Sequence, residues 1–207
     1  MIIINFKNYK SGKDVLSLAK KIHNKKILVC IPSVNIKEVI DKTKLKVYAQ
    51  HVDYQNSKRS TGFVTPKSIK KAGVLGTLLN HSEHKLKLEE IKRTVNECKK
   101  LNLKVIVCAS NLKEVNQIKK LKPFAIAFED PKLIATGKSI TKYNSKVINT
   151  FIKIIEKTKI IPICGAGISS REDYLKALEL GCKGVLISSA IANSKTPEKF
   201  LKEISKI

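Results

Sequence analysis

The chain has 207 residues, of which 43% are hydrophobic, and its 41 basic and 17 acidic residues give a formal net charge of +24. This length and composition suit one globular domain with a sizeable core and exclude a disordered chain. No apolar run approaches the length of a membrane span, and the apolar residues 1–5 lack the basic flank and cleavage site of a secretory signal. We therefore expect a single domain over residues 1–207, with no membrane partner and with a strand at its start.

The excess of positive charge has two explanations. Basic side chains neutralise phosphates in nucleic-acid-binding proteins, but those proteins concentrate charge on one face and use arginine for bidentate contacts. Here lysines dominate and are spread along the whole chain, which favours a solvated surface. We expect no nucleic-acid partner, although the positive field would still attract a small phosphorylated ligand.

The five cysteines are Cys30, Cys98, Cys108, Cys164 and Cys182. Their number is odd and no two have CxxC spacing, so the sequence indicates neither a disulfide framework nor a zinc site. Reduced thiols in the cytoplasm are the simplest interpretation, and we expect no metal.

Short apolar, β-branched runs alternate with amphipathic stretches along the chain. The runs predict eight strands, at residues 2–6, 26–31, 46–50, 74–79, 104–108, 124–128, 160–164 and 184–187. The amphipathic stretches predict helices at residues 14–22, 88–101, 112–121, 145–157 and 171–180. Uninterrupted apolar strands that alternate with helices are typical of a parallel sheet covered by helices. Eight such units favour an α/β fold with a closed (β/α)8 barrel of eight parallel strands, in which chemistry takes place at the carboxyl ends of the strands.

Two polar residues come at the end of the first strand. Asn5 and Lys7 are two residues apart, which places them on the same side of a strand. A lysine that points into the mouth of the barrel is a candidate partner for an anion, whereas a lysine at the rim is only solvated. With 41 basic residues in the chain, Lys7 alone favours the solvated alternative.

The fourth strand is followed by a histidine, His81, within residues 80–83. We predict a helical segment from near Lys85, and the dipole at its start would disfavour the imidazolium form of His81. A neutral imidazole can donate a hydrogen bond to a carbonyl oxygen. The other three histidines lack this placement and suit surface or structural roles.

The sixth strand ends in Glu129. A carboxylate at the end of an apolar run is partly desolvated, so its proton affinity should rise, as a general base requires; the alternative is a glutamate at the rim in a salt bridge. Residues 130–138 follow, with proline near the start and glycine near the end, as a hinged lid requires.

Small residues follow the seventh and eighth strands. Residues 164–170 read CGAGISS, and residues 187–191 read ISSAI. Small residues before a helix let backbone amides approach a phosphate. The loops after strands seven and eight form the frequent phosphate site of such barrels, so their order here indicates a phosphorylated ligand.

In their joint order, these pieces resemble the triosephosphate isomerase family across nearly the whole chain. The resemblance is carried by NFKNY at residues 5–9, AQH at 49–51, TG at 61–62, NHSE at 80–83, EDP at 129–131, IATG at 134–137 and CGAGIS at 164–169. The last of these motifs and the short length are similar to the archaeal branch. The resemblance implies a TIM barrel that interconverts dihydroxyacetone phosphate and D-glyceraldehyde 3-phosphate in glycolysis and gluconeogenesis, with no cofactor.

The resemblance also implies the catalytic roles. Glu129 would be the general base and His81 the neutral electrophile, the pairing already known for this family. Lys7 would stabilise the anionic substrate and transition state, with Asn5 on the same wall. Glu83 would pair with Lys7 and orient it.

The resemblance further implies how the substrate phosphate is held. Gly167, Ser188 and Ser189 would offer backbone amides to it. The lid would close over it with Ile134 and the neighbouring Pro131, Ala135, Thr136 and Gly137.

Three residues or segments depart from the family pattern. Asp130 stands where the family usually has proline after the base, and its carboxylate would raise the pKa of Glu129 or alter the stiffness of the lid. Ala135 replaces a lid glycine. Residues 188–190 lack the glycine expected near the eighth strand. We expect activity to be retained despite these changes.

The family pattern implies a homo-oligomer, a dimer or a tetramer, in which residues 51–64 insert into a partner subunit. The charge of each chain would oppose assembly. Two alternatives to the isomerase are another phosphate-binding barrel enzyme and a catalytically inactive basic binding protein. The combination of His81, Glu83 and Glu129 with a lid argues against both.

Overall fold

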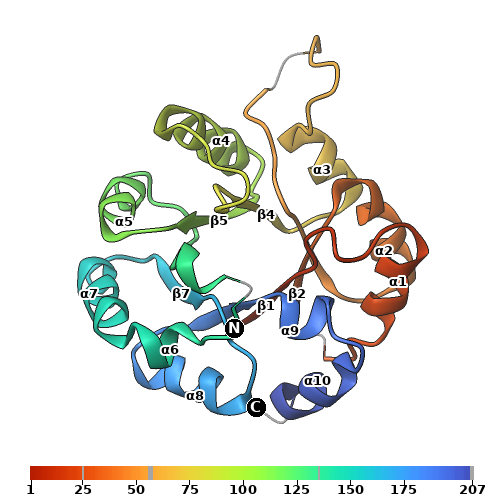
Figure 1. Ribbon diagram of the computed structural model, residues 1–207. Coiled ribbons are helices and arrows are strands. Elements are labelled where there is room, and N and C mark those ends of the chain that lie inside the picture. Colours follow the sequence, from red (N-terminus) through yellow and green to blue (C-terminus); the bar gives the residue numbers. More distant parts are fainter. Residues whose placement is uncertain (25, 56–57, 135, 206–207) are drawn as a thin grey trace.

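The computed structural model describes residues 1–24, 26–55, 58–134 and 136–205. Eight parallel strands form a closed barrel in the order of the chain (Figure 1). Each strand begins and ends within two residues of its predicted position, which confirms the (β/α)8 barrel. The strands are β1 Ile2–Asn5, β2 Leu28–Ile31, β3 Lys46–Ala49, β4 Gly76–Leu79, β5 Lys104–Ala109, β6 Ala125–Glu129, β7 Ile161–Gly165 and β8 Gly184–Ile187.

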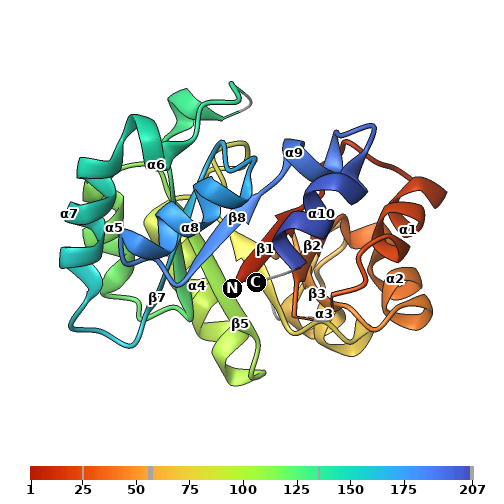
Figure 2. The same cartoon turned by 90° about the horizontal axis from the view of Figure 1, so that it is seen from below.

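Helices surround the strands (Figure 2). The five predicted helices are present as α1 Lys13–Lys20, α4 Leu88–Lys100, α5 Leu112–Lys119, α7 Ser145–Ile155 and α8 Arg171–Glu179. Five more were not predicted: α2 Ile36–Lys42, α3 Pro66–Ala72, α6 Ile140–Tyr143, α9 Ser189–Ala192 and α10 Pro197–Ser205. The predicted start near Lys85 is wrong, because α4 begins at Leu88. No helix in the described ranges is long and apolar enough to cross a membrane.

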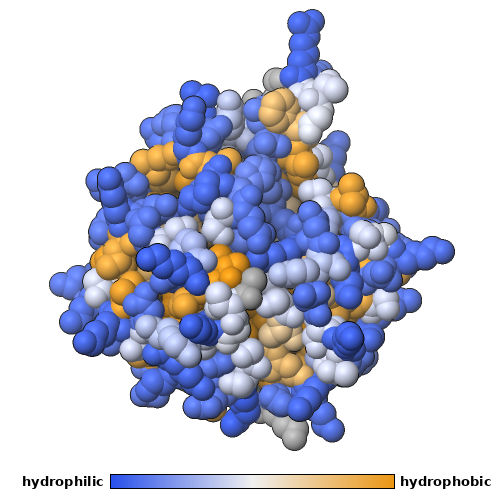
Figure 3. All heavy atoms as spheres, viewed as in Figure 1, coloured by the Kyte–Doolittle hydropathy of each residue, from blue (hydrophilic) through white to orange (hydrophobic). Residues whose placement is uncertain are grey.

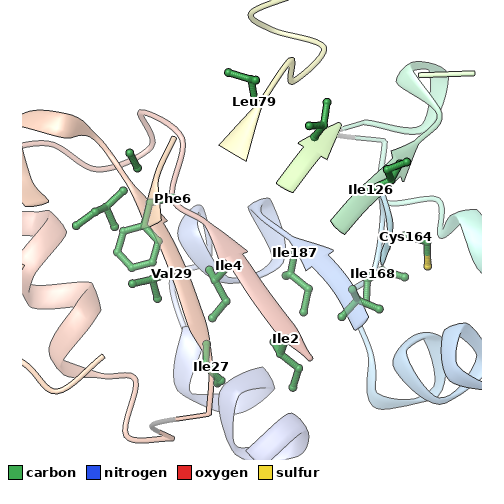
Figure 4. Packing of buried hydrophobic residues seen from close by; sticks show 14 of the residues in the cluster. Ile2, Ile4, Phe6, Ile27, Val29, Leu79, Ile126, Cys164, Ile168 and Ile187 are labelled. Atoms are coloured by element: carbon green, nitrogen blue, oxygen red, sulfur yellow. The ribbon is translucent and has the colours of Figure 1, made fainter. Parts of the chain in front are cut away.

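The alternation of side chains along each strand divides the core into two layers. On β1, Ile2 and Ile4 pack outwards against the helices (Figure 4), whereas Ile3 belongs to the cluster that fills the barrel. Parallel strands are buried on both faces, which explains their uninterrupted apolar sequence. Where a strand reaches the mouth of the barrel, the same alternation turns its last inward residue towards the cavity there. Asn5 therefore follows Ile3 inwards.

Candidate active site

A cavity of about 230 Å³ lies at the carboxyl ends of the strands. Glu83 does not line this cavity, but it bonds to Lys7, which does, and it lines an adjacent cavity. Pro131 and Thr136 belong to the predicted lid but do not line the first cavity, and Ala135 lies outside the described residues. The predicted site residues that line this cavity are Asn5, Lys7, His81, Glu129, Ile134, Gly137, Gly167, Ser188 and Ser189.

Lys7 is held in place from both ends. Its backbone has a positive φ of 46°, its N–H donates to Asn5 Oδ1 at 3.0 Å, and its carbonyl accepts from Gln50 Nε2 at 3.0 Å. Its Nζ donates to Glu83 Oε1 at 2.6 Å. The ammonium group is therefore a fixed positive charge at the edge of the cavity, and the solvated alternative for Lys7 is wrong.

His81 is held as a neutral imidazole. Its Nδ1 accepts a hydrogen bond from the backbone N–H of Glu83 at 3.2 Å, which leaves the ring proton on Nε2. Burial, together with the positive charges of Lys7 and Lys85, lowers the pKa of His81 to about 4, although Glu83 opposes the shift. The expected neutrality has this cause rather than a helix dipole, because His81 precedes a turn and α4 starts only at Leu88.

Glu129 is buried with one carboxylate oxygen unoccupied. The residue is 6% exposed, and its Oε2 has no hydrogen-bond partner among the described residues. Burial raises the pKa of Glu129 to about 7; Lys7 opposes this shift, Glu83 adds to it, and a hydrogen bond with Cys108 lowers it. An unsatisfied buried oxygen is costly, so it indicates an atom kept free to accept a proton.

The loops after β7 and β8 complete the wall of the cavity. Gly167 has φ 76°, and a Cβ atom there would clash with the carbonyl oxygen of Lys138, so only glycine fits. Ser188 Oγ donates to Asn5 O at 2.8 Å, which ties the β8 loop to β1. The first N–H groups of α9, at Ser189 and Ala190, have no acceptor within the helix and belong to residues that line the cavity. Although residues 188–190 lack the glycine of the family pattern, these backbone N–H donors are still present at the cavity.

The predicted lid begins with a short 3₁₀ helix, η2 Pro131–Leu133. Thr136 Oγ1 donates to Leu133 O at 2.9 Å and accepts from the Lys138 N–H at 3.2 Å. Asp130 is not among the groups that shift the pKa of Glu129; its carboxylate instead accepts from Asn144 Nδ2 and from the Lys132 N–H. The expected effect of Asp130 on that pKa is wrong.

Three further residues support the site and were not predicted from the sequence. Asn80 has φ 59° and bridges Cys108 O and the Leu86 N–H, which fixes the turn that carries His81. Gln50 holds the carbonyl of Lys7. Cys108 contacts Glu129 from the next strand. Because these contacts join separate strands, no spacing in the sequence signals them.

Comparison with known proteins agrees with this geometry. The family model for triosephosphate isomerase matches residues 1–206. The chain is 37% identical to the triosephosphate isomerase of Sulfurisphaera tokodaii and 39% identical to that of Saccharolobus solfataricus, each over 98% of this chain and 93% of the relative. It is 34% identical to that of Methanocaldococcus jannaschii, over 100% of this chain and 99% of the relative. The chain therefore belongs to the triosephosphate isomerase family.

Proposed function

We propose that Glu129, His81 and Lys7 carry out the isomerisation of dihydroxyacetone phosphate to D-glyceraldehyde 3-phosphate, as in glycolysis and gluconeogenesis. The observation that carries the proposal is the unoccupied, buried Oε2 of Glu129, 3.4 Å from the protonated Nε2 of a neutral His81. In this proposal the whole chain, residues 1–207, acts as one catalytic domain.

The reaction moves one proton between neighbouring carbons. Glu129 Oε2 takes a proton from C1 of the ketone, while His81 Nε2–H donates a hydrogen bond to the C2 oxygen, on which negative charge develops. A proton also moves from the C1 hydroxyl oxygen to the C2 oxygen, and return of the proton from Glu129 to C2 then gives the aldehyde. Lys7, fixed by Glu83, stabilises the negative charge of the enediolate, and Asn5 lines the same wall.

The phosphate end of the substrate sets its orientation. In the proposal, the backbone N–H groups of Gly167, Ser188 and Ser189 bind the phosphate, and Ile134 with the rest of residues 131–137 covers it. This cover matters because an enediolate next to a phosphate ester readily expels the phosphate in water.

A coupled assay with D-glyceraldehyde 3-phosphate tests these roles. Glu129→Asp withdraws the carboxylate by one methylene, and His81→Gln replaces the imidazole donor; each should lower kcat by about 10²-fold or more. The matched controls are Glu156→Asp and His23→Gln at exposed positions, which should leave kcat unchanged. Binding of 2-phosphoglycolate without any isomerisation by the unaltered chain would contradict the catalytic assignment.

We also propose that the chain forms a homo-oligomer, a dimer or a tetramer, through residues 51–64. The segment between β3 and α3 extends away from the barrel (Figure 1), and a cavity of about 220 Å³ lined by Asn8 and His84 lies beside Lys7. Phe63 is 47% exposed on this segment, and Val34 is 92% exposed after β2. The face drawn in Figure 3 is mostly hydrophilic with several apolar patches. The exposure of Phe63 and Val34 supports a contact with a second copy.

Sedimentation velocity tests the oligomer. The sedimentation coefficient should exceed that of a 23.1 kDa monomer and should rise with salt, because salt screens the repulsion between chains of charge +24. Phe63→Ser should weaken assembly, whereas Leu175→Ser, an exposed residue on α8, should not. A monomer at every salt concentration would contradict the proposal.

The third part of the proposal is a cytoplasmic location in an archaeal cell. The five cysteines are free and buried, which suits a reducing compartment, and the relatives named above come from archaea. Fractionation of the source cells should recover the activity with the cytoplasmic enzymes rather than with membranes or medium.

A further inference from the structure

The residue after Glu129 has no role in the reaction described above, yet both of its carboxylate oxygens are engaged. Asp130 Oδ1 accepts from the Lys132 N–H at 3.0 Å, and Asp130 Oδ2 accepts from Asn144 Nδ2 at 3.0 Å. Asp130 O also accepts from the Leu133 N–H at 3.0 Å. Asp130 therefore organises the first turn of the lid and joins it to a residue beyond the end of the lid.

Asn144 is a fixed anchor for this contact. It lies at the junction of α6 and α7, where its N–H donates to Ile140 O and its carbonyl accepts from the N–H groups of Val147 and Ile148. Helix α7 buries Ile148, Phe151 and Ile155 in the core. The side chain of Asn144 is thus presented by a packed helix and not by the lid.

The same helix holds the residue on the other side of Glu129. Phe128 stacks on Phe151 of α7 with ring centroids 5.5 Å apart. Because side chains alternate along a strand, residues 128 and 130 face α7 while Glu129 faces the cavity. The base is therefore flanked by two contacts, an aromatic stack with α7 before it and, after it, a hydrogen bond to Asn144, the residue that directly precedes α7.

The backbone of Asp130 has the conformation that a proline would impose. Its φ is −74°, within the range of about −65 ± 15° that a proline ring fixes. An aspartate can leave this conformation, whereas a proline cannot, so its two side-chain hydrogen bonds take over the restraint.

We propose that Asp130 and Asn144 are positioning residues that hold Glu129 and the first turn of the lid in place through their shared hydrogen bond. The inference rests on the proposed function of Glu129. Neither residue lines the cavity, so both act through the base and the lid.

A substitution cycle tests the contact. Asn144→Asp sets two carboxylates against each other and breaks the contact. In the double variant Asp130→Asn with Asn144→Asp, the new amide still accepts from the Lys132 N–H and donates to the new carboxylate. Both hydrogen bonds are restored with the partners exchanged. Asn116→Asp, at an exposed position on α5, adds the same charge elsewhere and is the matched control.

Two readouts separate positioning from general destabilisation. The first is the share of enediolate lost to elimination, in which the C3–O bond breaks, its electron pair leaves with the phosphate, and methylglyoxal and inorganic phosphate form. A loose lid raises this share for each isomerisation, whereas a smaller folded fraction lowers both reactions equally. The second is hydrogen–deuterium exchange at the Lys132 and Leu133 amides, which requires no activity.

We expect Asn144→Asp to lower kcat by about tenfold, to raise the eliminated share severalfold and to speed exchange at both amides. The double variant should return all three to within about twofold of the unaltered chain, by the logic of a double-mutant cycle. The inference is overturned if Asn144→Asp behaves like Asn116→Asp, or if the double variant is no better than Asn144→Asp. An unaltered chain that does not isomerise would refute the proposed function. If the unaltered chain isomerises normally and all the variants behave like it, only the present inference is refuted.

Discussion

Nε2 of His81 and Oε2 of Glu129 lie 3.4 Å apart in the mouth of the barrel, and burial shifts their pKa values in opposite directions. Burial disfavours whichever form is charged, so it lowers the pKa of the imidazole to about 4 and raises that of the carboxyl to about 7. Above pH 7 the histidine is therefore uncharged while the glutamate is ionised. One physical cause prepares a hydrogen-bond donor and a base at the same place.

The first prediction concerns the pH dependence of kcat/KM. The acid limb should have its midpoint near pH 7, because protonation of Glu129 removes the base, and His81 should remain neutral down to about pH 4. The coupled assay between pH 5 and pH 9 measures this limb. A midpoint at or below pH 6 would assign the limb to the substrate phosphate, whose second pKa is about 6, and would contradict the prediction.

The second prediction concerns stability. The pKa of Glu129 is raised from 4.5 to about 7 in the folded chain, so its contribution to stability is fully present below pH 4.5 and is lost as pH rises through about 7. Glu129→Gln lacks this titration. Its free energy of unfolding should exceed that of the unaltered chain by up to about 3 kcal/mol at pH 8, but not at pH 4. Urea unfolding at the two pH values measures the difference, and equal gains at both would argue against a titrating carboxyl.

The third prediction distinguishes the effects of Lys7 and Lys85 on the pKa values of His81 and Glu129. Lys7 lowers the pKa of both His81 and Glu129, whereas Lys85 lowers only that of His81. Lys7→Met should therefore raise both pKa values, and Lys85→Met should raise only the imidazole value. NMR titration of the imidazole and carboxyl carbons measures both groups. The charge assignment fails if the Glu129 pKa stays unchanged when Lys7 is removed.

The fourth prediction concerns the β7 loop. Gly167→Ala adds a methyl group that would clash with the backbone of Lys138 at a positive φ, so the loop must move. Binding of 2-phosphoglycolate should weaken by about tenfold or more, since a displaced donor no longer reaches the phosphate. Gly12→Ala is the matched control, because Gly12 also has a positive φ but open space around its Cα. Because Gly12 has φ 49° and ψ −129°, a conformation that an alanine rarely adopts, the change should cost about 1–3 kcal/mol of stability but leave the affinity unchanged. Isothermal titration and urea unfolding measure the two effects, and equal losses of affinity in both variants would disprove the packing argument.

Two of the helices that were not predicted, α2 and α3, escaped prediction because they are short. Helices α2 and α3 have seven residues each, too few for a clear helical period. The signals for α3 were nevertheless present: Thr65 caps it by accepting from the Ser68 N–H, Pro66 opens it, and Gly73 ends it in the left-handed region. Capping residues were the better guide for these short elements.

The eight strands, their order and the residues at their carboxyl ends could all be predicted from local sequence patterns. Those signals are local, because burial on both faces requires an uninterrupted apolar run at each strand. Which groups meet depends on how the chain folds in three dimensions. Lys7 bonds to Glu83, 76 residues away, and the free oxygen of Glu129 lies beside His81. Asp130 bonds to Asn144 and does not shift the pKa of Glu129. The physical reason is that closure of the barrel sets distances between strands and the burial of each charge, and neither quantity follows from a pattern within one strand.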